Sequence, residues 1–126
     1  MTRQEQTGER DLYFSDWCRQ NLPDSDTGMS IYDIDFYMFN WLKHLKNKNG
    51  EHLLVEVKSR NKRMNKGQKM MYESLSKWIS EGASKEGWRY KGFFCIRFEN
   101  TSFEDGKVFV NDKESSEEEI RELLSL

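Results

Sequence analysis

The sequence predicts one mixed α/β domain in which helices flank a sheet, and three observations lead to this prediction. The chain has 126 residues, a length that fits a single domain. Aromatic residues make up 13% of it, whereas disordered chains are poor in them. Segments with strand-like and helix-like periodicity alternate in the order α-β-β-α-β-β-α. We therefore expect one domain over residues 1–126, with residues 1–8 frayed.

The first helix is expected over residues 9–22, where apolar side chains recur at loosely helical spacing. Pro23 should stop it, because the residue before a proline disfavours helical backbone. Residues 23–28 follow as a Pro-Asp-Ser-Asp-Thr-Gly stretch, which has the composition of a turn.

A pair of strands is expected next. Residues 29–42 are rich in aromatic and β-branched side chains, which favour a strand. Residues 52–58 show strand-like alternation and predict the returning strand. Between them, Asn49-Gly50 is a strong signal for a hairpin turn. The two strands should therefore pair in antiparallel orientation.

The second half of the chain is expected to add a helix, two strands and a final helix. Asn65 can cap a helix that ends near Gly82, and a strongly apolar strand follows over residues 90–100. Its continuous apolar run favours a central position covered on both faces. A shorter strand over residues 107–111 and a short helix capped by Ser116 complete the order. The inward face of the longer helix is expected to carry Met71, Leu75, Trp78 and Ile79.

Composition restricts the class of protein. No apolar run approaches the ~18 residues that span a membrane, and the N-terminus lacks a signal-peptide core. We therefore expect an intracellular, cytoplasmic protein that does not enter membranes. Cys18 and Cys95 are far apart and belong to no Cys/His cluster, so a zinc site is not expected.

Charge is distributed unevenly along the chain. Residues 43–69 contain nine Lys or Arg and two Glu, a local net charge of +7. The rest of the chain has eleven basic and twenty acidic residues, a net charge of −9. This asymmetry suggests a basic patch for a polyanion, although by itself it favours a solvated face.

Carboxylates are predicted to meet on the paired strands. Glu56 and Lys58 alternate on one strand and so project to the same face, although the strand is otherwise mostly apolar. Asp33 and Asp35 lie on the neighbouring strand, and antiparallel pairing could bring one of them beside Glu56. Converging carboxylates need a cation, and oxygen ligands without His or Cys indicate Mg²⁺ or Mn²⁺. With Lys58 beside a phosphate oxygen, this equipment suits phosphodiester hydrolysis.

An Asp, a hairpin and then Glu-x-Lys resembles the active site of the PD-(D/E)XK nuclease superfamily. That superfamily includes restriction endonucleases, Holliday-junction resolvases and RecB-type exonucleases. The resemblance covers roughly residues 9–98 and implies a restriction-endonuclease-like fold with a core order of α-β-β-β-α-β. It implies Asp35, Glu56 and Lys58 as the catalytic centre of a nuclease acting on DNA, with Mg²⁺ or Mn²⁺ held by Asp35, Glu56 and Asp33.

A second motif adds to this resemblance. RecB-type members carry Gln-x-x-x-Tyr on the helix after Glu-x-Lys, and Gln68-Lys-Met-Met-Tyr72 stands ten residues after Lys58. At positions i and i+4, Gln68 and Tyr72 share one helix face and can point together at the site or at the nucleic acid. The resemblance implies a catalytic role for Gln68 and a DNA-binding role for Tyr72. The chain also resembles small phage-encoded nuclease-like proteins, which implies a phage or mobile-element origin.

The chain departs from the family pattern in two respects. The literal Pro-Asp is absent at the strand, so Asp33 and Asp35 compete for the catalytic position. We favour Asp35, which is nearer the hairpin turn and precedes an apolar stretch. Many family members also have an acid on the first helix, for which Glu9 and Asp16 are candidates.

Basic residues close to the predicted site are expected to contact phosphates. They are Arg60, Lys62, Arg63, Lys66 and Lys69. Two other classes stay open: an inert nucleic-acid-binding or assembly module with a nuclease-like fold, and a protein-interaction domain. The residues do not distinguish DNA from RNA or endonuclease from exonuclease. They do not fix the oligomeric state either, although a domain of this size covers little duplex alone and a homodimer would cover more.

Overall fold

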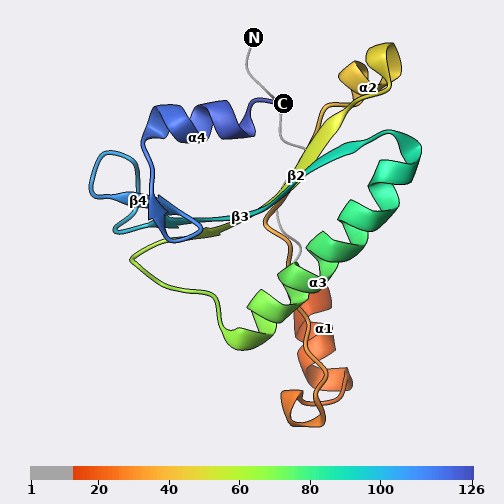
Figure 1. Ribbon diagram of the computed structural model, residues 1–126. Coiled ribbons are helices and arrows are strands. Elements are labelled where there is room, and N and C mark those ends of the chain that lie inside the picture. Colours follow the sequence, from red (N-terminus) through yellow and green to blue (C-terminus); the bar gives the residue numbers. More distant parts are fainter. Residues whose placement is uncertain (1–12) are drawn as a thin grey trace. The chain divides into compact units, whose positions relative to one another are not determined.

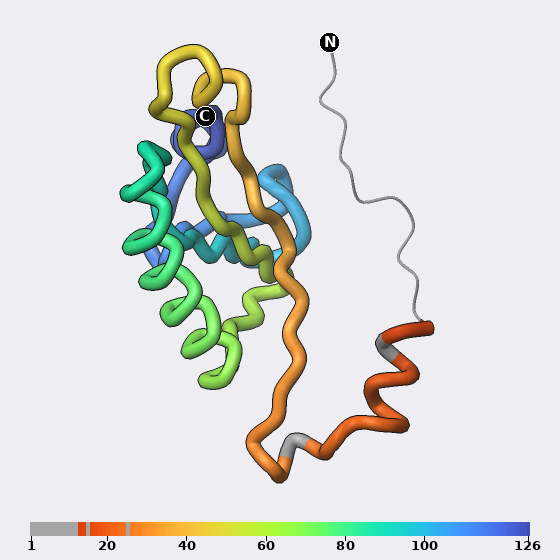
Figure 2. The backbone as a smooth tube through the Cα atoms, turned by 90° about the vertical axis from the view of Figure 1, so that its right-hand side faces the viewer, coloured from red at the N-terminus to blue at the C-terminus, as the bar shows by residue number. Residues whose placement is uncertain are grey.

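The computed structural model describes residues 13–126, without the side chains of Ser15 and Ser25 (Figures 1 and 2). The chain divides into two units, residues 1–31 and residues 32–126. Each unit is considered by itself. The single domain expected from chain length stays a prediction, and the expectations for residues 1–12 lie outside the described residues.

In the smaller unit, α1 (Tyr13–Asn21) confirms the described part of the first predicted helix. It ends two residues before Pro23, as expected from the constraint that proline places on its predecessor. A 3₁₀ turn, η1 (Ser25–Thr27), follows, and the Thr27 N–H donates to the Asp24 carbonyl at 3.0 Å. The turn predicted over residues 23–28 is therefore confirmed.

The larger unit is built on a five-stranded mixed sheet with the strand order β1-β2-β3-β4-β5. Strand β1 (Phe36–Phe39) pairs antiparallel with β2 (Glu51–Lys58), which pairs parallel with β3 (Arg89–Phe98). Strand β3 then pairs antiparallel with β4 (Val108–Val110), and β4 with β5 (Lys113–Glu114). The α/β class is confirmed, and β3 occupies the central position that its apolar run predicts.

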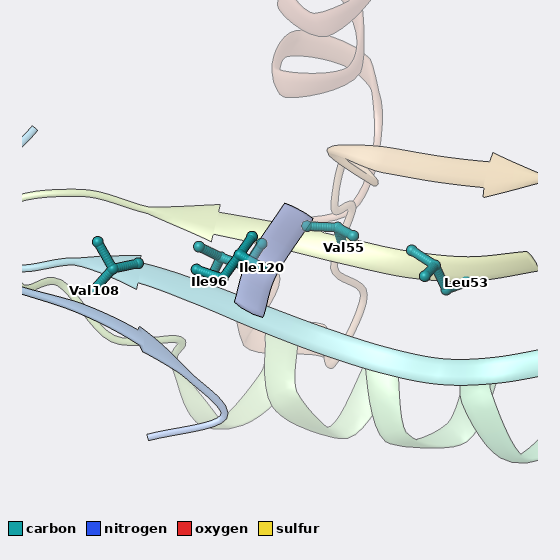
Figure 3. Packing of buried hydrophobic residues seen from close by; sticks show 5 residues of the cluster. All are labelled: Leu53, Val55, Ile96, Val108 and Ile120. Carbon is teal, nitrogen blue, oxygen red and sulfur yellow. The ribbon is translucent and has the colours of Figure 1, made fainter. Parts of the chain in front are cut away.

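Two helices cover opposite faces of this sheet (Figure 1). Helix α4 (Glu117–Leu124) packs Ile120 into a buried cluster on one face, and α3 (Lys66–Ala83) lies against the other. Burying one aliphatic side chain stabilises the fold by about 1.5–3 kcal/mol, so the cluster secures the sheet to α4. Its members are Leu53, Val55, Ile96, Val108 and Ile120 (Figure 3).

Both helices begin where their capping residues predict. The Asn65 side chain accepts a hydrogen bond from the Gln68 N–H at 2.7 Å, which starts α3. Ser116 and Glu119 form a reciprocal capping box at the start of α4. Among residues 13–126, no helix is both long and apolar enough to cross a membrane.

The segment between the first two strands differs from the prediction. The strand expected over residues 29–42 is confined to Phe36–Phe39, and a helix, α2 (Trp41–Asn47), follows it directly. Asn40 caps that helix by accepting from the Lys43 N–H at 2.9 Å. Leu and Lys are good helix formers, so the cap and the following Leu-Lys-His-Leu-Lys run outweigh the aromatic strand signal.

The expected hairpin turn at Asn49-Gly50 is therefore wrong, although the antiparallel pairing of the two strands is confirmed. Lys48 ends α2 in the left-handed region, with φ of 57°, and Asn49-Gly50 leads from there into β2. A Cβ atom on Gly50 would lie 2.5 Å from the His44 Cβ and 2.7 Å from the Trp88 ring. The glycine is needed for this close approach of side chains.

Two further expectations need correction. Strand β5 was not anticipated, because the turn that joins it to β4 contains no glycine. Asn111 and Asp112 both have positive φ, 49° and 68°, as a two-residue hairpin turn of type I′ requires. Trp78 is 63% exposed, because it lies roughly 120° around α3 from the buried Tyr72.

Candidate active site

The centre of the site is the carboxylate of Glu56, which is only 3% exposed. Gln68 Nε2 donates to Oε1 at 2.9 Å, and the Tyr72 hydroxyl donates to Oε2 at 2.6 Å. Lys58 Nζ lies 3.3 Å from Oε1. A buried charge costs several kcal/mol unless hydrogen bonds and an opposite charge compensate it. These three donors provide that compensation and fix the orientation of the carboxylate.

Strand β2 and helix α3 supply these four side chains, as the sequence predicts. Glu56 and Lys58 alternate along β2, so both project to the face that α3 covers. Gln68 and Tyr72 are one helical turn apart on α3 and both reach the same carboxylate. The proximity of these four residues is confirmed, while their roles stay predictions.

The first turn of α3 is held in place by a contact from the segment before β1. The Tyr32 hydroxyl donates to the Asn65 side-chain oxygen at 3.3 Å, beside the cap of the helix. A Cβ atom on Gly67 would fall 2.3 Å from the Tyr32 hydroxyl oxygen, so a larger residue here would displace that hydroxyl. Gln68, the next residue, lies in the helical turn that this contact and the Asn65 cap adjoin.

Tyr72 is completely buried, and its ring stacks on Phe93 of β3 with centroids 4.2 Å apart. Loss of solvation raises the pKa of the Tyr72 phenol, and its hydrogen bond to Glu56 raises it further. The hydroxyl therefore stays protonated at neutral pH and acts only as a donor to the carboxylate. It also makes a longer contact, 3.4 Å, to the Asp33 carbonyl oxygen.

Of the two competing aspartates, Asp35 lies closer to Glu56 in the strand register. Phe36 pairs with Val55, so one further step places Asp35 opposite Glu56. The Val57 N–H donates to Asp35 Oδ2 at 2.9 Å, which ties this carboxylate to β2 although it precedes β1. Asp33 lies two residues further from the strand.

The candidates for a first-helix acid, Glu9 and Asp16, stay predictions. Asp16 lies in α1 of the smaller unit, where it forms an ion pair with Arg19 at 2.7 Å. Glu9 falls outside the described residues.

The predicted phosphate-binding residues all have exposed side chains, on the loop after β2 and in the first turn of α3. Arg63 makes an ion pair with Asp112 at 2.7 Å, in which both side chains are largely exposed. Exposed pairs of this kind contribute only about 0–1 kcal/mol. The exposed residues are Arg60, Lys62, Arg63, Lys66 and Lys69.

Arg97 belongs to the same sheet face and was not anticipated. It is paired with Lys58 across the parallel strands, and only 8% of its side chain is exposed. Its guanidinium donates to the Asn61 side-chain oxygen, lies 3.5 Å from Asp112 and stacks 4.3 Å above the Phe109 ring. The sequence contained a signal for it, because an arginine inside an apolar strand needs buried partners.

The turn that follows Lys58 has an unusual backbone. Arg60 and Asn61 both lie in the left-handed region, with φ of 52° and 58°. Asparagine enters this region readily, whereas it costs about 1–2 kcal/mol for an ordinary residue such as arginine. The N–H groups of the two residues donate to the carbonyls of Asn100 and Phe98, at 2.6 and 3.0 Å. These bonds tie the loop between β2 and α3, residues 59–65 and called the basic loop below, to the end of β3.

The donor set suits a hard cation that keeps part of its water shell. Within residues 13–126, no three His, Cys, Asp or Glu side chains converge as a ready-made metal cage. Mg²⁺ is commonly held by one or two carboxylates together with waters and substrate phosphates. Glu56 on β2 and Asp35, just before β1, offer two carboxylates, which fits that mode of binding.

These features define the larger unit as an α/β domain with a five-stranded mixed sheet and a buried carboxylate–lysine centre. No protein-family model matches the chain, and searches of curated proteins and of solved structures likewise found no match.

Proposed function

We propose that this chain is a Mg²⁺- or Mn²⁺-dependent nuclease of the PD-(D/E)XK type that hydrolyses phosphodiester bonds in DNA. The observation that carries the proposal is the buried Glu56 carboxylate, held by Gln68, Tyr72 and Lys58. A sheet that needed only stability would gain more from an apolar side chain at this position. A carboxylate fixed from three sides is what preorganised catalysis requires.

In this proposal Asp35 and Glu56 hold the divalent ion. When bound, the ion would activate water and neutralise charge that develops on the phosphate. Gln68 and Tyr72 keep the Glu56 carboxylate in a single orientation through their hydrogen bonds. The Lys58 side chain is 23% exposed, so its ammonium can contact a phosphate oxygen while remaining beside Glu56. Its positive charge would stabilise the negative charge of the transition state.

The exposed cations after β2 serve substrate binding in this proposal. Nucleic-acid affinity comes largely from Lys and Arg that neutralise phosphates and release counterions. The five predicted phosphate-binding residues lie in the loop after β2 and in the first turn of α3, which also contains Gln68. A strand bound along them would lie close to Lys58.

A second candidate function is an inert nucleic-acid-binding module with the same fold. It is favoured by one observation: Glu56 is already satisfied by three donors from within the protein. The carboxylate could therefore be a structural anchor between β2 and α3, with the basic loop as the sole functional surface. Cleavage and binding assays separate the two candidates.

We expect cleavage of DNA in Mg²⁺ or Mn²⁺ and none in excess EDTA, because the proposed site uses carboxylate ligands only. Single-stranded, duplex and branched DNA of matched sequence should each be incubated with the protein under the three conditions. Glu56→Gln provides the control, since it keeps the shape of the side chain and removes its charge. Sustained cleavage in EDTA, or by the Glu56→Gln protein, would rule out the metal-dependent mechanism.

We also expect Asp35→Asn to reduce cleavage far more than Asp33→Asn, on the order of 10²-fold against less than ten-fold. The register sets Asp35 opposite Glu56, whereas Asp33 contacts Tyr72 through its backbone carbonyl, which the substitution retains. Single-turnover rates of the two variants, with circular dichroism to verify folding, decide the question. If Asp33→Asn alone were inactive, Asp33 would be the ligand.

A further inference from the structure

A pocket of about 440 Å³ lies beside the proposed active site, and neither the metal ligands nor Lys58 occupies it. Phe93, Cys95 and Arg97 line it from the central strand β3. The loop before α3, the start of that helix and the turn after β4 provide its other sides. Strands β3 and β4 and helix α3 are labelled in Figure 1. Its volume is within the range of small-molecule sites, about 300–1,000 Å³.

The pocket is joined to the site by two direct connections. In the parallel register Cys95 stands beside Glu56, so the pocket wall is one strand away, about 4.8 Å. The Phe93 ring stacks on Tyr72, whose hydroxyl donates to Glu56. A group lying against Phe93 would therefore be separated from the Glu56 carboxylate by two stacked aromatic side chains, Phe93 and Tyr72.

The lining of the pocket has a net positive charge, and one of its cations is in an ion pair that a phosphate could replace. Arg63, Lys69 and Arg97 supply three cations, against the carboxylates of Glu73 and Asp112. The ion pair between Arg63 and Asp112 is largely exposed, so a phosphate can replace the carboxylate at little cost. Arg97, in contrast, is fixed by several partners and gives a permanent positive charge at the pocket wall.

The apolar part of the lining suits a flat, ring-shaped group. Phe93 and Met64 are both half-buried and line the pocket together with the cations. Nucleobases bind proteins by stacking on aromatic side chains, while the backbone phosphates are held by Lys and Arg. Apolar and cationic groups around one cavity are therefore complementary to a nucleotide.

We propose that this pocket receives one unpaired nucleotide of the strand whose scissile phosphate lies at Glu56 and Lys58. Its base lies against Phe93 and Met64, and Arg63 and Lys69 hold the adjacent phosphates. This inference rests on the proposed nuclease function and narrows its substrate to single-stranded or splayed DNA. A paired base cannot enter such a pocket without being flipped out of its helix, which costs unstacking energy.

The chain contains a reporter for this test. Cys18 and Cys95 are its two cysteines, so Cys18→Ser leaves one thiol, which lines the pocket. Burial raises the pKa of the Cys95 thiol, so its reaction with iodoacetamide should be followed at pH 8.5 to 9. We would measure this rate in EDTA with oligothymidylate, with a duplex of the same length, and with inorganic phosphate. Fluorescence anisotropy would report binding of each DNA.

Bound oligothymidylate should slow alkylation at least ten-fold, whereas duplex and inorganic phosphate should change the rate less than two-fold. Lys69→Ala should weaken single-strand binding about ten-fold and remove the protection at fixed DNA concentration. Lys85→Ala, an exposed lysine just beyond the far end of α3, is the matched control and should retain both. If oligothymidylate does not bind, or binds and leaves Cys95 equally reactive, the proposal is wrong.

Cleavage of DNA by the Cys18→Ser protein in Mg²⁺ is measured in parallel. Protection without cleavage would refute only the nuclease function, and cleavage without protection only the pocket.

Discussion

Lys58→Met should slow single-turnover cleavage on the order of 10²- to 10³-fold, as removal of one preorganised electrostatic donor commonly does. Methionine keeps the length and the apolar stem of the side chain but removes the ammonium that lies 3.3 Å from Glu56. In the proposed mechanism that charge opposes the negative charge which develops on the phosphate. The loss should therefore fall on the chemical step.

The same variant separates the enzyme from an inert binding module. Equilibrium binding of the same DNA in Ca²⁺ should weaken by less than ten-fold, because only one of many cations has been removed. Lys62→Met, at an exposed position of the basic loop, is the matched control and should weaken binding without a large effect on the chemical step. If Lys58→Met lost binding and cleavage in equal proportion, Lys58 would be a binding residue. Cleavage at the wild-type rate would remove it from the mechanism.

Substitutions of Tyr72 should have the largest effects on stability. Tyr72→Ala removes a completely buried ring and leaves a cavity beside Phe93, which should cost about 3–5 kcal/mol of unfolding free energy. Tyr72→Phe keeps the ring but takes the donor away from Glu56 Oε2, and should cost about 1–3 kcal/mol. Urea denaturation with an unchanged slope gives both values.

Tyr90→Phe provides the matched control for the hydroxyl. Tyr90 also donates a hydrogen bond, at 2.9 Å, but its acceptor is the neutral Ser76 hydroxyl, so the loss should be about 0.5–1.5 kcal/mol. An equal cost for the two substitutions would show that the hydrogen bond to the Glu56 carboxylate stabilises the fold no more than a neutral one.

The contribution of Tyr72 to stability should depend on pH. The pKa of Tyr72 is raised above its unfolded value of 10.0, so the stability that its phenol contributes to the fold is complete below pH 10 and is lost as pH rises further. The difference between wild type and Tyr72→Phe should accordingly shrink above pH 10.

The sequence was most informative where local chemistry and periodicity agree. Asn65 and Ser116 mark the starts of α3 and α4 because their side chains satisfy N–H groups that every helix leaves open. The alternation in β2 set Glu56 and Lys58 on one face of that strand. The helical spacing of Gln68 and Tyr72 put both of these on one face of α3. Each of these predictions depends on neighbours within about four residues.

The sequence was least informative where two local signals competed. The aromatic residues before Trp41 favoured a long strand, and Asn49-Gly50 favoured a hairpin turn, yet α2 lies between β1 and β2. The side chain of Asn40 decides this by capping a helix that propensity alone leaves undetermined. Strand β5 was missed for a related reason, because Asn111 and Asp112 adopt a turn for which glycine is the usual signal.

The sequence by itself determined the α/β class, most helix boundaries and the residue types of the candidate site, because these follow from short-range periodicity and capping. Only the tertiary structure decided that Gln68 and Tyr72 both hydrogen-bond to Glu56. It also decided that Asp35, tied to Val57, stands opposite Glu56, and that Arg97 lies beside Lys58 with a pocket at its side. These relations join segments that are 12 to 39 residues apart in the chain. They depend on strand register and on the packing of α3 against β3, which no local pattern specifies.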